Sequence, residues 1–543
     1  MDKKKKKFKK AVLLLVPLLL IFYLSSTYFV NEIYYYNSSK SFMNYIVYGA
    51  IIFVSLMVVI FTIWGFKCVK KNKTKSYVLY FIFLIIFIAG EIFISYNLSK
   101  VSSSIKKVTN EYTTYSASLI VLKGSNVENL SDLKKKTIGI ISDTNNVEAY
   151  VIANEIIDEN NISSNNLKEY DDFTDMLSDL YKEKIDGAFV SSSFASLFAT
   201  TDGFEDIGQR VKTITKKEKK IKKNDDSNKT AKTLTEPFTV LLMGVDSEKE
   251  SLASSSSLNG DSLMLITFNP NTMNATILSI PRDTYVPIAC YKNKAKNKIN
   301  AAAYGGAECM IKTIEDLTDI KIDYWVKINF KGVVKLVDAL GGIEVDVPYS
   351  FCEQNSNRKF GNSTIYVDKG RQILNGEQAL AFARNRHPWP QYCGKKYSNY
   401  TSNDFIRGQN QQQIVNAMLN KLKGVNSLSE IYRVLDVVGD SIDTNINRPT
   451  MITGFDTFKN ILLRSRNITN EDFVGTQRLY LSGYDKTMSG IYYYMFYKQS
   501  LEEITEAMEI NLEIREPQMD KEFSFSINNP FESTQIGKGT YSY

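Results

Sequence analysis

Residues 238–246 read FTVLLMGVD, an apolar run that ends in an aspartate. A polar loop, ESLASSSSLNGD, leads to a second aspartate and then straight into the apolar stretch SLMLITF. A third run, ATILSIPRDTYV, brings Arg282 and Asp283 to its end. Short apolar runs bounded by polar loops are typical of buried strands, and ligands of α/β folds gather where strands end. This stretch therefore predicts an α/β domain with a site at its strand ends.

The two aspartates of this stretch, Asp246 and Asp261, are expected at neighbouring strand ends, close enough to share a cation. Two carboxylates are too few for a complete protein cage, but Mg²⁺ is commonly held by one or two carboxylates together with phosphate oxygens of the substrate. The pair favours a Mg²⁺ site; the alternative is two aspartates that cap loops.

An arginine pair follows later, in the stretch ARNRHPWP at residues 383–390. Alternate residues of an extended segment point the same way, so Arg384 and Arg386 are expected to form one forked clamp. Planar guanidinium groups suit phosphate oxygens better than ammonium groups do. The alternative is two solvated surface charges. His387, the only histidine of the chain, is expected simply to follow the pair, and without a second histidine a Ser-His-Asp triad is disfavoured.

Further polar side chains belong to the same domain. Lys298 opens KINAAAYGG, and NDFIRGQNQQQ predicts a long helix that starts near Asp404. Arg407 and Gln411 are four residues apart and therefore share one helix face. A pair of acids with a cluster of cations favours a site for Mg²⁺-bridged pyrophosphate.

The order of these motifs resembles that of the LytR-CpsA-Psr family of envelope phosphotransferases. The motifs are LLMGVD, GDSLMLITFNP, LSIPRDTYV, KINAAAYGG, VDALGGIEVDVP, LNGEQALAFARNR and DFIRGQNQQQ, and the resemblance covers residues 236–515. It implies a mixed central sheet between helical layers. It also implies transfer of a phospho-glycan from a polyprenyl-pyrophosphate carrier to a sugar hydroxyl of the cell wall, typically of peptidoglycan.

The resemblance also implies roles for single residues. It makes Asp246 and Asp261 ligands of Mg²⁺, and Asp283 an acid beside the reacting phosphate. Arg282, Arg384 and Arg386 would act with Asp283 in catalysis. The pyrophosphate would be bound by Arg282, Lys298, Arg384, Arg386, Arg407 and Gln411. The chain departs from the family pattern at Asn410, where an arginine is usual, and in an enlarged segment between Arg386 and Asp404.

Phosphoryl transfer mainly requires positioning and neutralisation of charged oxygens, which this residue set supplies. Two other activities stay open: a pyrophosphatase that uses the same site with water as acceptor, and a solute-sensing receptor of the envelope. A nucleic-acid partner is disfavoured, because the net charge of +7 is modest and unevenly spread.

The N-terminal region, residues 1–97, predicts three transmembrane helices. After the basic start MDKKKKKFKK come long apolar runs at residues 11–30, 45–64 and 77–97, each long enough to cross about 30 Å of hydrocarbon. Lysines before the first run and between the second and third place these segments in the cytoplasm. Everything after residue 98 is then expected outside the cell. Such a long first run disfavours a cleaved signal peptide.

Residues 115–211 alternate apolar strands with amphipathic helices, which predicts a small parallel α/β module. Its stretches DLKKKTIGIISDT and KIDGAFV resemble one lobe of extracytoplasmic solute-binding proteins. Residues 212–235 are rich in lysine and lack an apolar period, so they predict a solvated linker. Residues 516–543 are expected to be a C-terminal tail.

Of the five cysteines, Cys68 falls on the cytoplasmic side and is expected to be a free thiol. The other four are external, where disulfides persist, and four cysteines allow three pairings. Pairing neighbours in sequence, Cys290 with Cys309 and Cys352 with Cys393, closes two modest loops around the predicted site. Crossed pairings and reduced thiols stay open.

Overall fold

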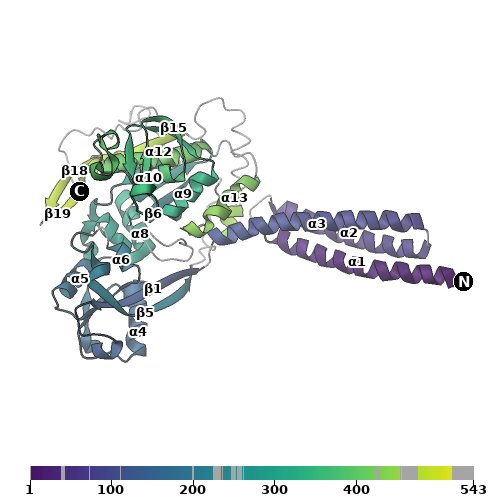
Figure 1. Cartoon of the computed structure of the whole chain (residues 1–543), viewed down its shortest axis with the longest axis horizontal. Helices are drawn as coiled ribbons and strands as arrows, with labels where there is room; N and C mark the ends of the chain where they lie inside the picture. The colour runs from purple at the N-terminus through teal and green to yellow at the C-terminus, as the bar shows by residue number, and fades with distance from the viewer. Residues whose placement is uncertain are drawn as a thin grey trace. The chain divides into compact units, whose positions relative to one another are not determined.

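The computed structural model describes residues 2–37, 43–71, 74–109, 112–198, 201–223, 234, 236–245, 252, 260, 262–421, 428–452, 454, 475–488 and 490–516. It divides into two compact units (Figure 1). The helical unit comprises Met1–Lys107 and Arg448–Asn460, and the α/β unit comprises Val108–Asn447 and Ile461–Tyr543.

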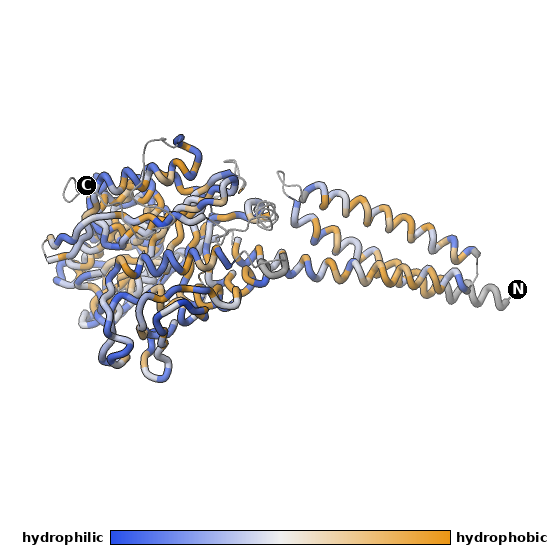
Figure 2. Tube along the Cα trace, turned by 90° about the horizontal axis from the view of Figure 1, so that it is seen from above, coloured by the Kyte–Doolittle hydropathy of each residue, from blue (hydrophilic) through white to orange (hydrophobic). Residues whose placement is uncertain are grey.

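The helical unit contains three long helices, α1 (Asp2–Tyr34), α2 (Met43–Lys71) and α3 (Thr74–Val108). Each carries a stretch long and apolar enough to cross a membrane, seen as the orange parts of the helices in Figure 2. The predicted spans fall within these helices. Large apolar side chains such as Leu13 and Phe93 point outward, as expected where lipid rather than water is the solvent.

A mixed six-stranded sheet forms the centre of the main domain, which we define as residues 236–447 and 461–516. Its strand order is β16-β11-β6-β7-β8-β17. The β11/β6 and β8/β17 pairs are parallel and the other pairs are antiparallel. The strands are β6 (Phe238–Val245), β7 (Ser262–Asn269), β8 (Asn274–Ile280), β11 (Tyr324–Asn329), β16 (Ile442–Thr444) and β17 (Gly475–Tyr480).

Helices cover both faces of this sheet, because successive side chains of a strand point to opposite faces and both sets are apolar. On one face Met264 and Ile277 pack against Val415 of α12 (Asp404–Lys421). On the other face the strand residues share a core with α8 (Gly306–Thr318) and α15 (Lys498–Asn511). The predicted α/β/α layering with a mixed sheet is confirmed.

Shorter elements surround these layers. The helices are α9 (Phe330–Ala339), α10 (Gly376–Arg384), α11 (Pro390–Cys393) and α13 (Leu428–Val438). The strand pairs are β9 (Tyr285–Pro287) with β10 (Lys296–Lys298), β12 (Ile343–Val347) with β15 (Gly370–Leu374), β13 (Phe351–Glu353) with β14 (Ile365–Val367), and β18 (Gly483–Met488) with β19 (Ile491–Phe496). These elements are separate from the six-stranded sheet, and all but β18 and β19 lie between its strands along the chain.

The N-terminal module, which we define as residues 112–223, has a five-stranded sheet of order β3-β2-β4-β1-β5. Its strands are β1 (Tyr112–Leu122), β2 (Ile138–Ile141), β3 (Leu167–Tyr170), β4 (Gly187–Ser191) and β5 (Val211–Lys222), and its helices are α4 (Ala153–Glu159), α5 (Phe173–Tyr181), α6 (Phe194–Leu197) and α7 (Ile207–Arg210). The predicted parallel arrangement is found only for β2, which runs parallel to β3 and to β4. The sheet as a whole is mixed, because β1 runs antiparallel to both β4 and β5.

The predicted solvated linker at residues 212–235 is wrong in its first part. Residues 211–222 form β5, which pairs with β1 along its whole length. Two of its lysines, Lys217 and Lys219, form ion pairs with Glu155 of α4. The charge run that indicated a linker therefore belongs to a strand, with lysines on both of its faces.

The module and the main domain share apolar contacts around Tyr304, which belongs to the 3-10 helix η6 (Ile299–Gly305). Its ring lies 4.7 Å from that of Phe198 and 5.8 Å from that of Phe173, measured between centroids. The Tyr304 hydroxyl is 2.7 Å from that of Thr201, and the Asn146 amide donates to the Tyr304 carbonyl at 3.1 Å. These contacts bind the module to the segment that follows Lys298.

Two disulfides close loops in the main domain. Cys290 bonds Cys309 and Cys352 bonds Cys393, with Cα–Cα distances of 5.5 and 5.8 Å. These are the pairs formed by neighbours in sequence. The first bridge packs against Gly305, where an added Cβ would lie 2.6 Å from the Cys290 sulfur. The bridge thus braces the end of η6.

Candidate functional site

The candidate site lies at the edge of the sheet where β6 and β8 finish and β7 starts. Gly244 of β6 pairs with Ser262 of β7, and Leu263 pairs with Ile280 of β8. The predicted metal ligands Asp246 and Asp261 lie outside the described residues. Val245, the residue before Asp246, ends β6, and Ser262, the residue after Asp261, begins β7. We call this region the strand-end site.

Lys298 is brought to the strand-end site by β-pairing. It ends β10, which pairs with β9, and the backbone of Asn300 donates to the Arg282 carbonyl at 3.2 Å. The Lys298 Nζ lies 3.0 Å from Asp283 Oδ1 and 3.0 Å from Asp202 Oδ2. Asp202 belongs to the N-terminal module. The lysine is therefore held between carboxylates from two parts of the chain.

Three arginines gather around Asp404, the first residue of α12. Its carboxylate lies 3.1 Å from Arg407 Nη2, 3.6 Å from Arg386 Nη1 and 3.8 Å from Arg282 Nε. We call Arg282, Arg386 and Arg407 the arginine cluster. Each guanidinium has five N–H donors arranged in a planar fork. The arrangement suits a polyanion such as a diphosphate.

The charges of the site set the protonation of its members. Burial would raise the pKa of Asp404, but the three arginines hold that pKa below its usual range. Burial would lower the pKa of Lys298, but Asp283 and Asp202 outweigh it and the pKa is raised. Burial and then Arg386 lower the pKa of His387. At neutral pH Asp404 and Lys298 are charged and His387 is neutral.

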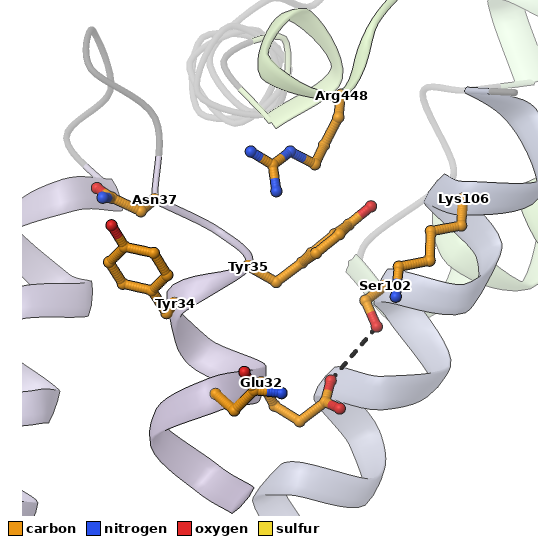
Figure 3. A pocket seen from close by; sticks show the side chains of 8 residues that line it. Glu32, Tyr34, Tyr35, Asn37, Ser102, Lys106 and Arg448 are labelled. Carbon is orange, nitrogen blue, oxygen red and sulfur yellow. Dashed lines mark hydrogen bonds between the residues drawn. The ribbon is translucent and has the colours of Figure 1, made fainter. Parts of the chain in front are cut away.

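The pocket of Figure 3 belongs to the helical unit and contains none of these residues. It is lined by Asn31, Glu32, Tyr34, Tyr35, Asn37, Ser102, Lys106 and Arg448. The Ser102 hydroxyl donates to Glu32 at 3.4 Å, and the Arg448 guanidinium lies 4.9 Å from the centre of the Tyr35 ring. The predicted chemistry is confined to the α/β unit.

A family model supplies the identification. The LytR_cpsA_psr family model matches residues 207–510, more than half of the 543-residue chain. The chain belongs to the LytR-CpsA-Psr family.

Curated LytR-CpsA-Psr relatives include transferases. The chain is 31% identical over 306 residues to the polyisoprenyl-teichoic acid–peptidoglycan teichoic acid transferase TagU of Bacillus mycoides, covering 56% of this chain and 89% of the relative. It is 36% identical over 219 residues to biofilm regulatory protein A of Streptococcus mutans, covering 39% of this chain and only 50% of that relative.

Solved structures of the LytR-CpsA-Psr family are also similar to this chain. Bacillus subtilis TagV is 28% identical, with a TM-score of 0.41, and the match covers 51% of this chain and 98% of TagV. TagT bound to LIIa-WTA is 27% identical, with a TM-score of 0.38, and the match covers 52% of this chain and 92% of TagT.

Most of the family-predicted cations converge, but the reasoning that placed Arg384 beside Arg386 on one extended segment is wrong. Arg384 is the last residue of α10, whose N-cap is Asn375. The backbone becomes extended at the next residue, Asn385. The Arg384 guanidinium lies 4.6 Å from the centre of the Phe330 ring and donates to the Asn355 carbonyl at 3.3 Å. Burial lowers its pKa. The two arginines thus meet different partners.

The α12 residues divide between the site and the core. The Gln411 side-chain oxygen accepts a hydrogen bond at 2.8 Å from the hydroxyl of Ser262, the first residue of β7. Asn410, which replaces the usual arginine of LytR-CpsA-Psr sequences, is 1% exposed and donates to the Phe382 carbonyl at 3.2 Å. Asn410 therefore ties α12 to α10 and does not face the strand-end site.

Three residues of the site were not selected from the sequence. The sequence predicts Asp404 only as the start of a helix, although an acid three residues before Arg407 on that helix is a usable signal. Tyr493 of β19, whose ring centre lies 5.8 Å from the Lys298 Nζ, carries no motif. Asp202 lies in the N-terminal module, 96 residues before Lys298, and no local pattern points to it.

Proposed function

We propose that this protein transfers a phospho-glycan from a polyprenyl-pyrophosphate carrier to a hydroxyl of peptidoglycan. The observation that carries the proposal is the arginine cluster, three guanidiniums on one partly open carboxylate beside Lys298. The names of the TagU and TagT relatives, which act between polyisoprenyl-linked teichoic acid and peptidoglycan, support the same class of reaction.

The reaction forms a bond between an acceptor oxygen and the phosphorus next to the glycan, and breaks the bridge to the second phosphate. The hydroxyl proton passes to solvent water, and polyprenyl phosphate departs with the electron pair of the broken P–O bond. Such a transition state is stabilised mainly by fixed positive charge. The arginine cluster and Lys298 are the described residues that supply it.

Asp283 orients two of these cations, Lys298 and Arg282. Its Oδ1 faces Lys298 at 3.0 Å, and its Oδ2 faces the Arg282 Nε at 3.5 Å. With a cation at each oxygen, the carboxylate fixes the direction of both neighbours rather than waiting as a free proton acceptor. Its backbone carbonyl also accepts from the Tyr494 amide at 2.8 Å, which joins the site to β19.

Mg²⁺ belongs to the proposal as a resident cofactor. Asp246 and Asp261 would hold it, and when bound it supplies charge neutralisation for the two phosphates. The positive-inside pattern of the N-terminal lysines supports an α/β unit that lies outside the cell, where peptidoglycan is found.

Two measurements test the function. Mass spectrometry of lipid that co-purifies with the full-length protein from membranes should find a polyprenyl phosphate or pyrophosphate species. Incubation with a polyprenyl-pyrophosphate-linked glycan and peptidoglycan should then yield a phosphodiester-linked glycan. Release of free glycan phosphate at the same rate with and without peptidoglycan would instead establish a pyrophosphatase.

A further inference from the structure

The N-terminal module places a carboxylate in the strand-end site. Asp202 Oδ2 lies 3.0 Å from the Lys298 Nζ, at the same distance as Asp283 Oδ1 on the other side. The Lys298 and Asp283 side chains are 15% and 13% exposed, whereas that of Asp202 is 55% exposed. Of the two acids on this lysine, Asp202 is the one that an incoming anion can displace.

The position of Asp202 is fixed by packing and not only by its ion pair. The hydroxyl of its neighbour Thr201 is 2.7 Å from the Tyr304 hydroxyl, and the Phe198 ring is tilted against the Tyr304 ring at 4.7 Å between centroids. The Phe204 amide donates to the Thr201 carbonyl at 2.9 Å and closes a turn around Asp202. Tyr304 lies in η6, which begins directly after Lys298. The carboxylate and the lysine are therefore tethered to the same short helix.

The part of the site around Lys298 has fewer cations for each carboxylate than the arginine cluster has. One ammonium faces two carboxylates, while in the arginine cluster three guanidiniums share Asp404. A phosphate oxygen that approaches Lys298 must compete with Asp202 for the same ammonium group. Opposite charges this close hold the lysine in place, and like charges this close oppose the anion.

We propose that Asp202 is a positioning residue of the strand-end site: it holds the Lys298 ammonium beside Asp283 until a phosphate oxygen of the donor replaces it. The module is then a part of the donor site. This inference rests on the proposed function, because it requires a phosphate ligand at Lys298.

The test uses the full-length protein in detergent and inorganic pyrophosphate as probe, with affinity measured by calorimetry. Asp202→Asn should bind pyrophosphate about two- to fivefold more tightly than wild type, the range expected for a partly exposed ion pair. The gain should shrink as salt is raised. Asp202→Glu, which keeps the charge, should return the affinity toward wild type.

Asp206→Asn is the matched control, because it removes one carboxylate from the same segment, where Asp206 pairs with Arg210 at 2.7 Å. It should leave the affinity unchanged. Equal or weaker binding by Asp202→Asn, or an equal gain in Asp206→Asn, overturns the role of Asp202 while the proposed function stands. A wild-type protein that does not bind pyrophosphate at all overturns both. A lower KM for the donor in Asp202→Asn at an unchanged melting temperature separates positioning from a merely structural role.

Discussion

Two carboxylates of the α/β unit each hold several cations, and they do so differently. Asp443 of β16 is 1% exposed and meets Lys223 at 2.6 Å and Lys327 at 2.7 Å. The side chain of Asp404 is 27% exposed and meets three guanidiniums at 3.1 to 3.8 Å. The Asp443 group is buried and its contacts are short, and we call it the sealed group. The Asp404 group is partly exposed and its contacts are longer, and we call it the open group.

The difference separates a structural ion group from a ligand site. In the sealed group the contacts are short and the Lys327 side chain is only 2% exposed, so Asp443 matches its charge inside the fold. In the open group, three guanidiniums gather at one partly exposed carboxylate, with Asp283 beside Arg282, and such a cluster of cations suits an anionic ligand. Substitutions in the first should change stability, and substitutions in the second should change transfer.

The largest effect is expected at the sealed group. Asp443→Ala leaves Lys327 buried without its counter-charge, which typically costs about 3–5 kcal/mol of unfolding free energy. Denaturant unfolding should show this loss, while the specific activity of the folded fraction stays close to wild type. Adding Lys327→Met removes the orphaned charge and should recover part of the stability. A stable Asp443→Ala variant with lost activity would reverse the assignment.

The next effect is expected in the arginine cluster. Arg407→Ala should slow transfer about 10²- to 10³-fold, as removal of one transition-state donor typically does. Arg407→Lys should recover only a part, since an ammonium cannot present the fork. Arg433→Ala, an exposed arginine of α13, serves as the control. Transfer within threefold of wild type in Arg407→Ala would show that the cluster does not bind the reacting phosphates.

A smaller pair of effects distinguishes Arg384 from Arg386. Arg384→Lys loses the contact with Phe330 and should cost about 1 kcal/mol of stability. Arg386→Lys should leave stability unchanged and slow transfer about tenfold, because its guanidinium reaches Asp404. Thermal melts and initial rates of both variants check this. Equal losses of transfer with unchanged stability would support a forked clamp of both arginines instead.

The smallest effect is a pH dependence. The arginine cluster lowers the pKa of Asp404 in the folded protein, so its stabilising contribution is present above the unfolded value near 3.8 and is lost as pH falls through the folded pKa. The stability difference between wild type and Asp404→Asn should therefore be constant from pH 5 to 7 and shrink below about pH 4. A difference that grows on acidification would contradict the ionised state of Asp404.

The sequence predicted correctly that the motif after β8 lies close to other charged residues of the site. Arg282 and Asp283 follow β8 directly, and Lys298 and Arg407 were correctly expected close by. Local patterns failed where distant partners decide the structure. The lysines of β5 read as solvent-exposed because their partner, Glu155, lies on a helix about sixty residues earlier.

The misplaced arginine has a comparable cause. Whether residue 384 is helical or extended depends on where α10 ends, and that end is set by packing of Arg384 against Phe330 and residues 354–355. Neither contact is visible in ARNRHPWP. Asp202 was missed for the same reason, since its role exists only once the module packs on η6.

The Tyr304 contacts have a practical consequence for the boundaries of a shortened protein. The Tyr304 ring lies between Phe173 and Phe198 of the module, so a chain that began at Phe238 would expose it to water together with neighbouring core residues. Such a chain would also lack Lys223, one of the two partners of Asp443. We expect residues 112–516 to melt in one cooperative transition, and trimming to the main domain alone to yield aggregation-prone material.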